Sequence, residues 1–192
     1  MLDVSNKKLL SYIIGIAIGD GNLSNPNGRA VRLRVTCDVK YPKLINKISK
    51  SIKAIAPNNS VALVFRKQKN AIDVSCYSND WEKILGWKAK GGSKINQKIS
   101  VPDWIIKNKE YSKNCLQGLF QTDGSIYKDR KYLTVNFVSH IPSLARKIYE
   151  MIEFLGYNPH KQIIEKTKNN KYTIRVSKDI NNFIKTIKLT KY

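Results

Sequence analysis

Two apolar segments of the same design, residues 13–21 and 116–124, dominate the pattern of hydrophobic and polar positions along the chain. Each is too short to span a membrane and leaves little polar surface, which predicts a buried helix. Each ends in Asp-Gly, with a glycine five positions before the aspartate: Gly15 precedes Asp20, and Gly118 precedes Asp123. The pair indicates a duplicated protein in which two helices each deliver one carboxylate to the edge of a packed interface.

The pattern around the first segment predicts one complete half of such a protein. Asp3 or Ser5 is expected to cap the first helix, strict alternation indicates strands, and Pro42 opens a helix with apolar residues at helical spacing. After that first helix, the expected elements are a loop at 22–28, a strand at 31–37, a helix at 42–55, strands at 61–67 and 71–77, and a short helix at 81–85.

The second half repeats the first. Leu133 and Pro142 match Leu33 and Pro42 at a constant offset of 100 residues, and a second apolar helix is expected from near Ser112 to Asp123. We therefore expect an α+β fold of two pseudo-symmetric αβαββα-type halves packed through the two apolar helices, with antiparallel sheets that form a saddle. The expected boundaries are 1–87 for the first half, 88–100 for a linker and 101–192 for the second half.

The amino-acid composition indicates the kind of partner that the protein binds. The chain has 192 residues, is 42% hydrophobic and carries a formal net charge of +21. Such an excess of positive charge indicates a polyanion, and nucleic acid is the obvious candidate. A membrane surface is disfavoured, because the basic residues are spread over strand-like segments instead of lining one amphipathic helix. Three scattered cysteines argue against a zinc site or a disulfide framework.

The outward positions of the expected strands are basic or hydrogen-bonding. Arg and Lys neutralise phosphates or read guanine, Asn and Gln read adenine, and a β-ribbon fits the major groove. The residues expected to contact double-stranded DNA are Arg29, Arg32, Arg34, Thr36, Arg66, Gln68, Asp73, Ser75, Lys128, Arg130, Tyr132, Thr134, Asn136, Lys166, Thr173 and Arg175.

The two aspartates suggest the chemistry. If the helices pack about a pseudo-twofold axis, Asp20 and Asp123 reach the same end, where neighbouring carboxylates repel unless a cation lies between them. They are hard oxygen ligands, suited to magnesium. Beside a phosphodiester, such ions activate water and stabilise the leaving oxygen.

With these motifs, the sequence resembles the LAGLIDADG homing endonucleases of the single-chain, two-motif kind. Residues 13–21 and 116–124 match the nine-residue motif of that family, with the aspartate in the eighth place. The approach to the second motif is also similar, through Lys98, Val101, Pro102, Trp104 and Ile105. The resemblance implies magnesium-dependent, site-specific cleavage of both strands of a long DNA target. A free-standing intron-encoded or engineered enzyme is expected, because the sequence shows no N-terminal Cys or Ser nucleophile and no C-terminal His-Asn of a protein-splicing domain. We expect a monomer without an obligate protein partner, because one chain already carries both halves.

The resemblance also implies a metal site. Its ligands are Asp20 and Asp123, together with the preceding residues Gly19 and Thr122. We expect manganese to substitute for magnesium, and calcium to bind without cleavage. The protein is expected to be intracellular, in a bacterial or archaeal cytoplasm or in an organelle, because the first residues are too polar for a signal peptide.

One position departs from the family pattern. Many members carry a glutamine or lysine at the end of the first sheet strand, where it orders solvent near the metals, but the matching positions here are Cys37 and Phe137. The candidates to replace that group are Asp38, Lys40, Lys128, Lys131 and His140, of which Lys128 and Lys131 join the two aspartates as expected catalytic residues. The alternative function is a non-cleaving DNA- or RNA-binding relative, such as an intron maturase or a transcriptional regulator.

Overall fold

The computed structural model describes residues 1–130, 132–167 and 169–190. Both halves of the chain contain a four-stranded antiparallel sheet, with strand orders β1-β2-β4-β3 and β5-β6-β8-β7. The elements of the first half are α1 (Lys7–Gly19), β1 (Gly21–Ser24), β2 (Arg32–Asp38), α2 (Pro42–Ile55), β3 (Val61–Arg66), the 3-10 turn η1 (Lys67–Lys69), β4 (Ala71–Tyr77) and α3 (Trp81–Leu85). Those of the second half are α4 (Asp103–Ile106), α5 (Lys109–Thr122), β5 (Gly124–Asp129), β6 (Tyr132–Ser139), α6 (Pro142–Phe154), β7 (Pro159–Ile164), β8 (Lys171–Val176) and α7 (Ile180–Thr186).

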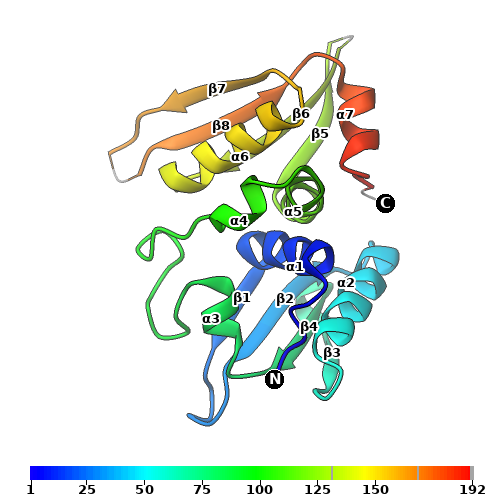
Figure 1. The fold of residues 1–192 in the computed structure, drawn as a ribbon, viewed down its shortest axis with the longest axis vertical. Helices are drawn as coiled ribbons and strands as arrows, with labels where there is room; N and C mark the ends of the chain where they lie inside the picture. Colours follow the sequence, from blue (N-terminus) through cyan, green and yellow to red (C-terminus); the bar gives the residue numbers. More distant parts are fainter. Residues whose placement is uncertain (131, 168, 191–192) are drawn as a thin grey trace.

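The α+β fold with two related halves is confirmed. Figure 1 shows α1 and α5 side by side in the middle of the molecule, with one sheet on either side of the pair. One hydrophobic core runs through both halves and includes Ile14, Leu33, Leu119 and Phe183, all fully buried. Among the residues that the structure describes, no helix is both long and apolar enough to cross a bilayer.

The prediction of a loop at 22–28 is wrong for the first residues of that range, which belong to β1. Gly21 pairs with Val35 and Leu23 pairs with Leu33, and Leu23 is buried beneath the sheet. Four residues are too few for the alternation of a strand to show in the sequence, so tertiary pairing decides this element. Because β5 occupies the same place after the second aspartate, the order of elements from α1 onward and from α5 onward is αββαββα instead of αβαββα.

The helix starts also differ from expectation. The side chain of Asn6, not of Asp3 or Ser5, caps α1 by accepting the N–H of Leu9 at 3.0 Å. Asn108 caps α5 in the same way, and that helix therefore begins at Lys109, before Ser112. In both cases an asparagine oxygen satisfies a backbone donor that the first helical turn leaves without a partner.

The contact between α1 and α5 depends on glycine. A Cβ at Gly118 would lie 2.5 Å from the carbonyl oxygen of Tyr12, and a Cβ at Gly15 would overlap the carbonyl oxygen of Cys115. A buried hydrogen bond of 2.9 Å, donated by the Tyr12 hydroxyl to Gln121 Oε1, joins the same two helices. The two helix backbones are therefore in direct contact at these glycines.

Residues 87–100 are all described and contain neither helix nor strand. Trp87 and Ile99 near the two ends of this segment are nevertheless buried in the core. The linker is thus irregular in its backbone but packed against the protein. The boundaries 1–87, 88–100 and 101–192 remain a proposal.

Candidate nucleic-acid interface and metal site

The two aspartates follow directly on the last residues of the paired helices. Asp20 succeeds Gly19 at the end of α1, and Asp123 succeeds Thr122 at the end of α5. A Cβ at Gly19 would lie 3.3 Å from Asp123 Oδ2, and nearer still to the Thr122 side chain. The carboxylate of Asp123 therefore lies against the last turn of the helix that presents Asp20. Both aspartates are exposed to solvent.

A lysine from the linker reaches this junction. Lys94 Nζ donates hydrogen bonds to three carbonyl oxygens in the last turn of α1: Ala17 at 2.9 Å, Ile18 at 2.7 Å and Gly19 at 2.6 Å. An ammonium at a helix C-terminus satisfies carbonyls that lack helical partners and interacts favourably with the helix dipole. Burial lowers the pKa of Lys94 to about 8, and the carboxylates of Asp123 and Asp20 act in the opposite direction. Both acids thus influence one lysine.

Sequence reasoning missed Lys94. The linker contains several lysines in a polar stretch, and neither their spacing nor their neighbours single one out. Only the folded path of the linker brings its side chain to α1. There it interacts with both Asp123 and Asp20.

The donor set at this junction fits magnesium. Mg²⁺ is usually bound through one or two carboxylates together with retained waters and substrate phosphates, and does not require a cage made only of protein ligands. Asp20 and Asp123 supply two carboxylates on an open surface, and within the described residues no site gathers three or more His, Cys, Asp or Glu side chains. The Gly19 carbonyl is already bonded to Lys94, and the Thr122 hydroxyl donates back to Gly118 and Leu119 within its own helix. The two carboxylates are the charged ligands of this set, and the part of Gly19 and Thr122 in holding the metal stays a prediction.

Cys37 lies beside the first acid, where the family pattern has a polar group. Its side chain is buried, and burial raises the pKa of its thiol to about 12, with further contributions from Asp20 and Asp73. Phe137 is buried in the aromatic contacts around Phe120. Neither side chain can order water as a glutamine or lysine does.

The structure gives the described candidates for this role other surroundings or partners. Lys128 is five residues beyond Asp123 along β5, a distance of about 16 Å in an extended strand. It pairs with Leu133, so its side chain lies on the face of the sheet opposite to Thr134. Asp38 is engaged by Lys40, through the backbone N–H at 3.0 Å and the ammonium at 2.9 Å. His140 is exposed and lies 3.1 Å from the carbonyl oxygen of Asn170. Lys131 lies outside the described residues.

The polar face expected for the first sheet is present. The register pairs Arg32 with Tyr77, Arg34 with Ser75 and Thr36 with Asp73, so these side chains share the face opposite to the core. The Nε atom of Arg34 is buried and has no hydrogen-bond partner among the described residues. The Arg34 side chain as a whole is partly exposed on this face, and a guanidinium in such a position is suited to a phosphate or a guanine edge.

Asp73 does not project freely from this face. It is buried, accepts a hydrogen bond of 2.7 Å from the Thr36 hydroxyl, and forms an ion pair with Arg66 at the end of β3. The carboxylate thus orients Arg66 instead of presenting itself to a base. Ser75 is also buried, so its contribution to contact is small.

In the second sheet, Asn136 and Arg175 lie opposite each other on neighbouring strands. The Asn136 amide donates to the Tyr127 hydroxyl at 2.7 Å, and Arg175 donates to the Thr134 hydroxyl at 3.0 Å. Tyr127, Asn136, Thr173 and Arg175 line a hollow of about 520 Å³, to which His160 and Gln162 of β7 also contribute. His160 and Gln162 were not expected there, although strand alternation along β7 could have suggested them. Thr134 is fully buried.

The remaining expected DNA contacts lie in turns or at strand ends. Arg29 is exposed between β1 and β2, the backbone of Gln68 is in η1, and Lys166 is exposed between β7 and β8. Arg130 has a positive φ of 56° in the turn after β5, and Tyr132 at the start of β6 is 76% exposed. Their contact with DNA stays a prediction.

Comparison with known families identifies the class. Residues 9–82 match the model of the WhiA LAGLIDADG-like domain, and residues 110–188 match the model of the LAGLIDADG-like domain. The chain therefore belongs to the LAGLIDADG family and carries two of its domains in tandem. The comparison with curated proteins found no match.

Solved structures agree with this assignment. The structure of I-DmoI in complex with DNA and Mn has a TM-score of 0.70 and 15% sequence identity, over 97% of this chain and 99% of that chain. An I-DmoI variant in complex with its target DNA in the presence of Mg gives a TM-score of 0.68 at 15% identity, over 96% of this chain and 98% of that chain. The N-terminal LAGLIDADG domain of DUF199/WhiA gives a TM-score of 0.60 at 16% identity, over 97% of this chain and 86% of that chain. At these identities the likeness establishes the fold.

Proposed function

We propose that this protein is a site-specific endonuclease that cleaves both strands of a long double-stranded DNA target with divalent metal. The observation that carries the proposal is the position of the Asp123 carboxylate, 3.3 Å from a Cβ built on Gly19, at the end of the helix that presents Asp20. Each acid directly precedes the first strand of its sheet, and the outward faces of the two sheets carry arginine, asparagine and threonine. The structures of I-DmoI with DNA and Mn or Mg support the proposal by analogy of fold.

Each group of residues has a role in this proposal. Asp20 and Asp123 would hold magnesium, which supplies an activated water and stabilises the leaving oxygen when bound. Lys94 holds the last turn of α1 and thereby the backbone that carries Asp20. Arg32, Arg34 and the other residues of the two faces bind phosphates and base edges. Manganese substitutes for magnesium, and calcium supports binding without cleavage.

The same proposal covers the partner and the setting. Because one chain already supplies both halves, the protein acts as a monomer on DNA without an obligate protein partner. We further propose that it is intron-encoded and acts inside a bacterial or archaeal cell or an organelle.

A non-cleaving DNA- or RNA-binding function, such as that of an intron maturase or a transcriptional regulator, is the second candidate. The buried Cys37 beside Asp20 favours it, because a protonated thiol cannot order the attacking water. The family model that matches the first half is named for WhiA and not for an endonuclease. Both candidates use the same basic faces, so DNA binding alone does not separate them.

The test begins with selection of a target. Random-sequence duplexes that bind in calcium are enriched and sequenced, and the site obtained is placed in a supercoiled plasmid. We expect the protein to convert the plasmid to nicked and then linear forms when magnesium is present. Asp20→Asn should abolish this cleavage and leave the affinity for the DNA site unchanged. Tight and selective binding without nicking in magnesium or manganese would overturn the endonuclease and leave the second candidate.

A further inference from the structure

A second recess lies at the other end of α1, away from Asp20. It has a volume of about 310 Å³ and lies between the N-terminal segment, the start of α1, α3 and α4. Lys7 and Leu10 belong to the first turns of α1, and the 13 residues of that helix span about 20 Å. The recess is therefore separate from the acids. It is built by both halves, because Trp104 comes from α4 and its other walls come from the first half.

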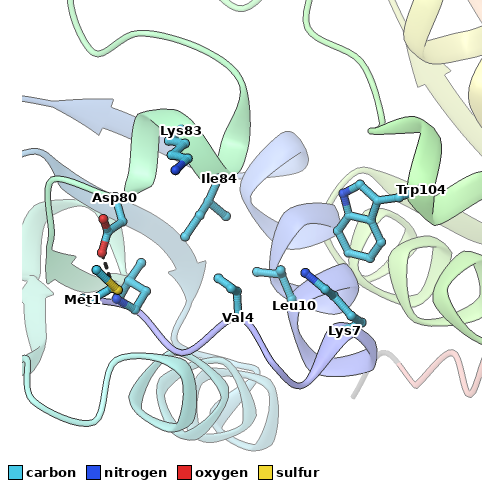
Figure 2. A pocket seen from close by; sticks show the side chains of 9 residues that line it. Met1, Val4, Lys7, Leu10, Asp80, Lys83, Ile84 and Trp104 are labelled. Carbon is cyan, nitrogen blue, oxygen red and sulfur yellow. Dashed lines mark hydrogen bonds between the residues drawn. The ribbon is translucent and has the colours of Figure 1, made fainter.

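Its walls combine an aromatic ring, apolar side chains and two cations. Leu2 and Leu10 are buried, Val4 and Ile84 add partly exposed apolar surface, and the Trp104 ring is half-buried. Figure 2 shows Lys7 beside Trp104 on one side of the recess and Lys83 above Ile84. Lys7 Nζ lies 5.3 Å from the centroid of the Trp104 ring, and both lysines are exposed.

Asp80 is the acidic side chain that lines this recess, and it is engaged with the backbone. Its Oδ2 atom accepts the N–H of Leu2 at 2.8 Å. Two exposed ammonium groups therefore line the recess, whereas the carboxylate is held at the opposite wall in Figure 2. This charge pattern favours an anionic ligand with a flat or apolar body.

We propose that this recess binds an unpaired nucleotide of a single-stranded nucleic acid, with the base against Trp104 and the phosphate at Lys7 and Lys83. Recesses of this size that are mostly apolar and have a few convergent polar groups are typical of ligand sites, above all between domains. Stacking of a base on an aromatic ring beside cationic side chains is the general means of single-strand recognition. To admit the base, the Lys7 side chain moves off the ring and meets the phosphate.

A nucleotide fits this surface better than an acidic peptide does. A carboxylate could meet the lysines, but it offers no aromatic ring to stack on the Trp104 ring. The net charge of +21 further makes the chain a binder of polyanions. The inference does not depend on cleavage, since it concerns a different surface and requires no metal.

Tryptophan fluorescence provides a direct readout. Trp81 and Trp87 are 0% and 4% exposed, whereas Trp104 is half-buried, so the ring in the recess is the indole that a ligand reaches. We expect a short oligothymidylate to quench the emission of the wild-type protein and to leave the emission of Trp104→Phe unchanged. The same titration with oligouridylate compares RNA with DNA as the source of the nucleotide.

Variants separate this recess from the sheet faces. Binding of a labelled oligothymidylate should weaken about tenfold in Trp104→Ala, the range that loss of one stacked base produces. Lys83→Glu should weaken it severalfold, and Lys50→Glu, an equal charge reversal at an exposed residue of α2, should have little effect. Arg34→Ala should show the reverse selectivity, with duplex binding weakened and the response of Trp104 retained.

Three results would overturn the proposal. The first is oligothymidylate binding without a change in Trp104 emission, which would place the strand on the sheets. The second is equal loss of binding in Lys83→Glu and Lys50→Glu. The third is equal quenching by polyglutamate, which would show that the recess accepts an acidic peptide instead of a base. None of these results bears on whether the protein cleaves duplex DNA.

Discussion

Gly15 of α1 lies against the main chain of Cys115 in α5 so closely that no Cβ fits between them. Gly118 meets Tyr12 and Ile16 in the same way from the other helix. The spacing of the two backbones, and with it the position of both carboxylates, is therefore set by residues that lack side chains. In a molecule built from two halves, this contact determines where the acids meet.

Gly15→Ala should lower the free energy of unfolding by about 3 kcal/mol, the upper range for overpacking of a core, because the methyl group meets backbone that cannot move aside. Gly19→Ala should cost less, since the nearest atoms belong to the side chain of Thr122. Urea denaturation of the two variants tests this order. Equal losses would show that the helices adjust their separation freely.

Asp20→Asn or Asp123→Asn should abolish or strand-bias cleavage and leave DNA affinity nearly unchanged. Each change removes a charged metal ligand but preserves the size of the side chain and the Asp-Gly backbone turn at the end of the helix. Plasmid nicking in magnesium and binding in calcium, measured on the same preparations, are the two readouts. A collapse of affinity with unchanged cleavage per bound complex would contradict the metal role.

Lys94→Met should lower the free energy of unfolding by about 2 kcal/mol, because three carbonyls at the end of α1 lose a charged donor. Lys90 is exposed on the same linker, so Lys90→Met is the matched control and should be nearly neutral. Hydrogen exchange of the amides around Asp20 should accelerate only in the Lys94 variant. Similar behaviour of the two variants would mean that the contact has little energetic weight.

The cysteines should make stability fall at alkaline pH. Burial raises the pKa of the Cys76 thiol to about 11, above its ordinary value of 9.0. Above about pH 9 the unfolded chain therefore releases a proton that the folded chain keeps, and the free energy of unfolding declines as the pH rises from 9 to 11. Urea denaturation over this range should show a shallower decline for Cys76→Ala.

At pH 8 the native thiols should react slowly with a disulfide reagent, and rapid labelling would contradict their burial.

DNA binding should weaken steeply with salt, and each lost phosphate contact should reduce the slope by about one unit in a log–log plot. Arg34→Ala should show that reduction, because its partly exposed side chain lies on the outward face of the sheet. Lys50→Glu on α2 should leave the slope nearly unchanged. A shallow slope in the wild type, or equal slopes in all three proteins, would argue against the sheet faces as the DNA surface.

The sequence by itself determined the repeated architecture. The two Asp-Gly segments, the strand alternation around Val35 and the helix that opens at Pro42 are local patterns, and each element formed where its pattern indicated. The outward set Arg32, Arg34 and Thr36 was also readable, because side chains of a strand alternate strictly between its two faces.

Only the tertiary structure decided which polar residues meet. The short strand β1 exists because β2 pairs with it, Asp73 is withdrawn from the surface by Thr36 and Arg66, and Lys128 is carried away from the acids on the other face of β5. Lys94 reaches the end of α1 through an irregular linker whose path no local pattern encodes. Local periodicity specifies an element and its faces, whereas contacts between distant residues depend on how the elements and loops pack.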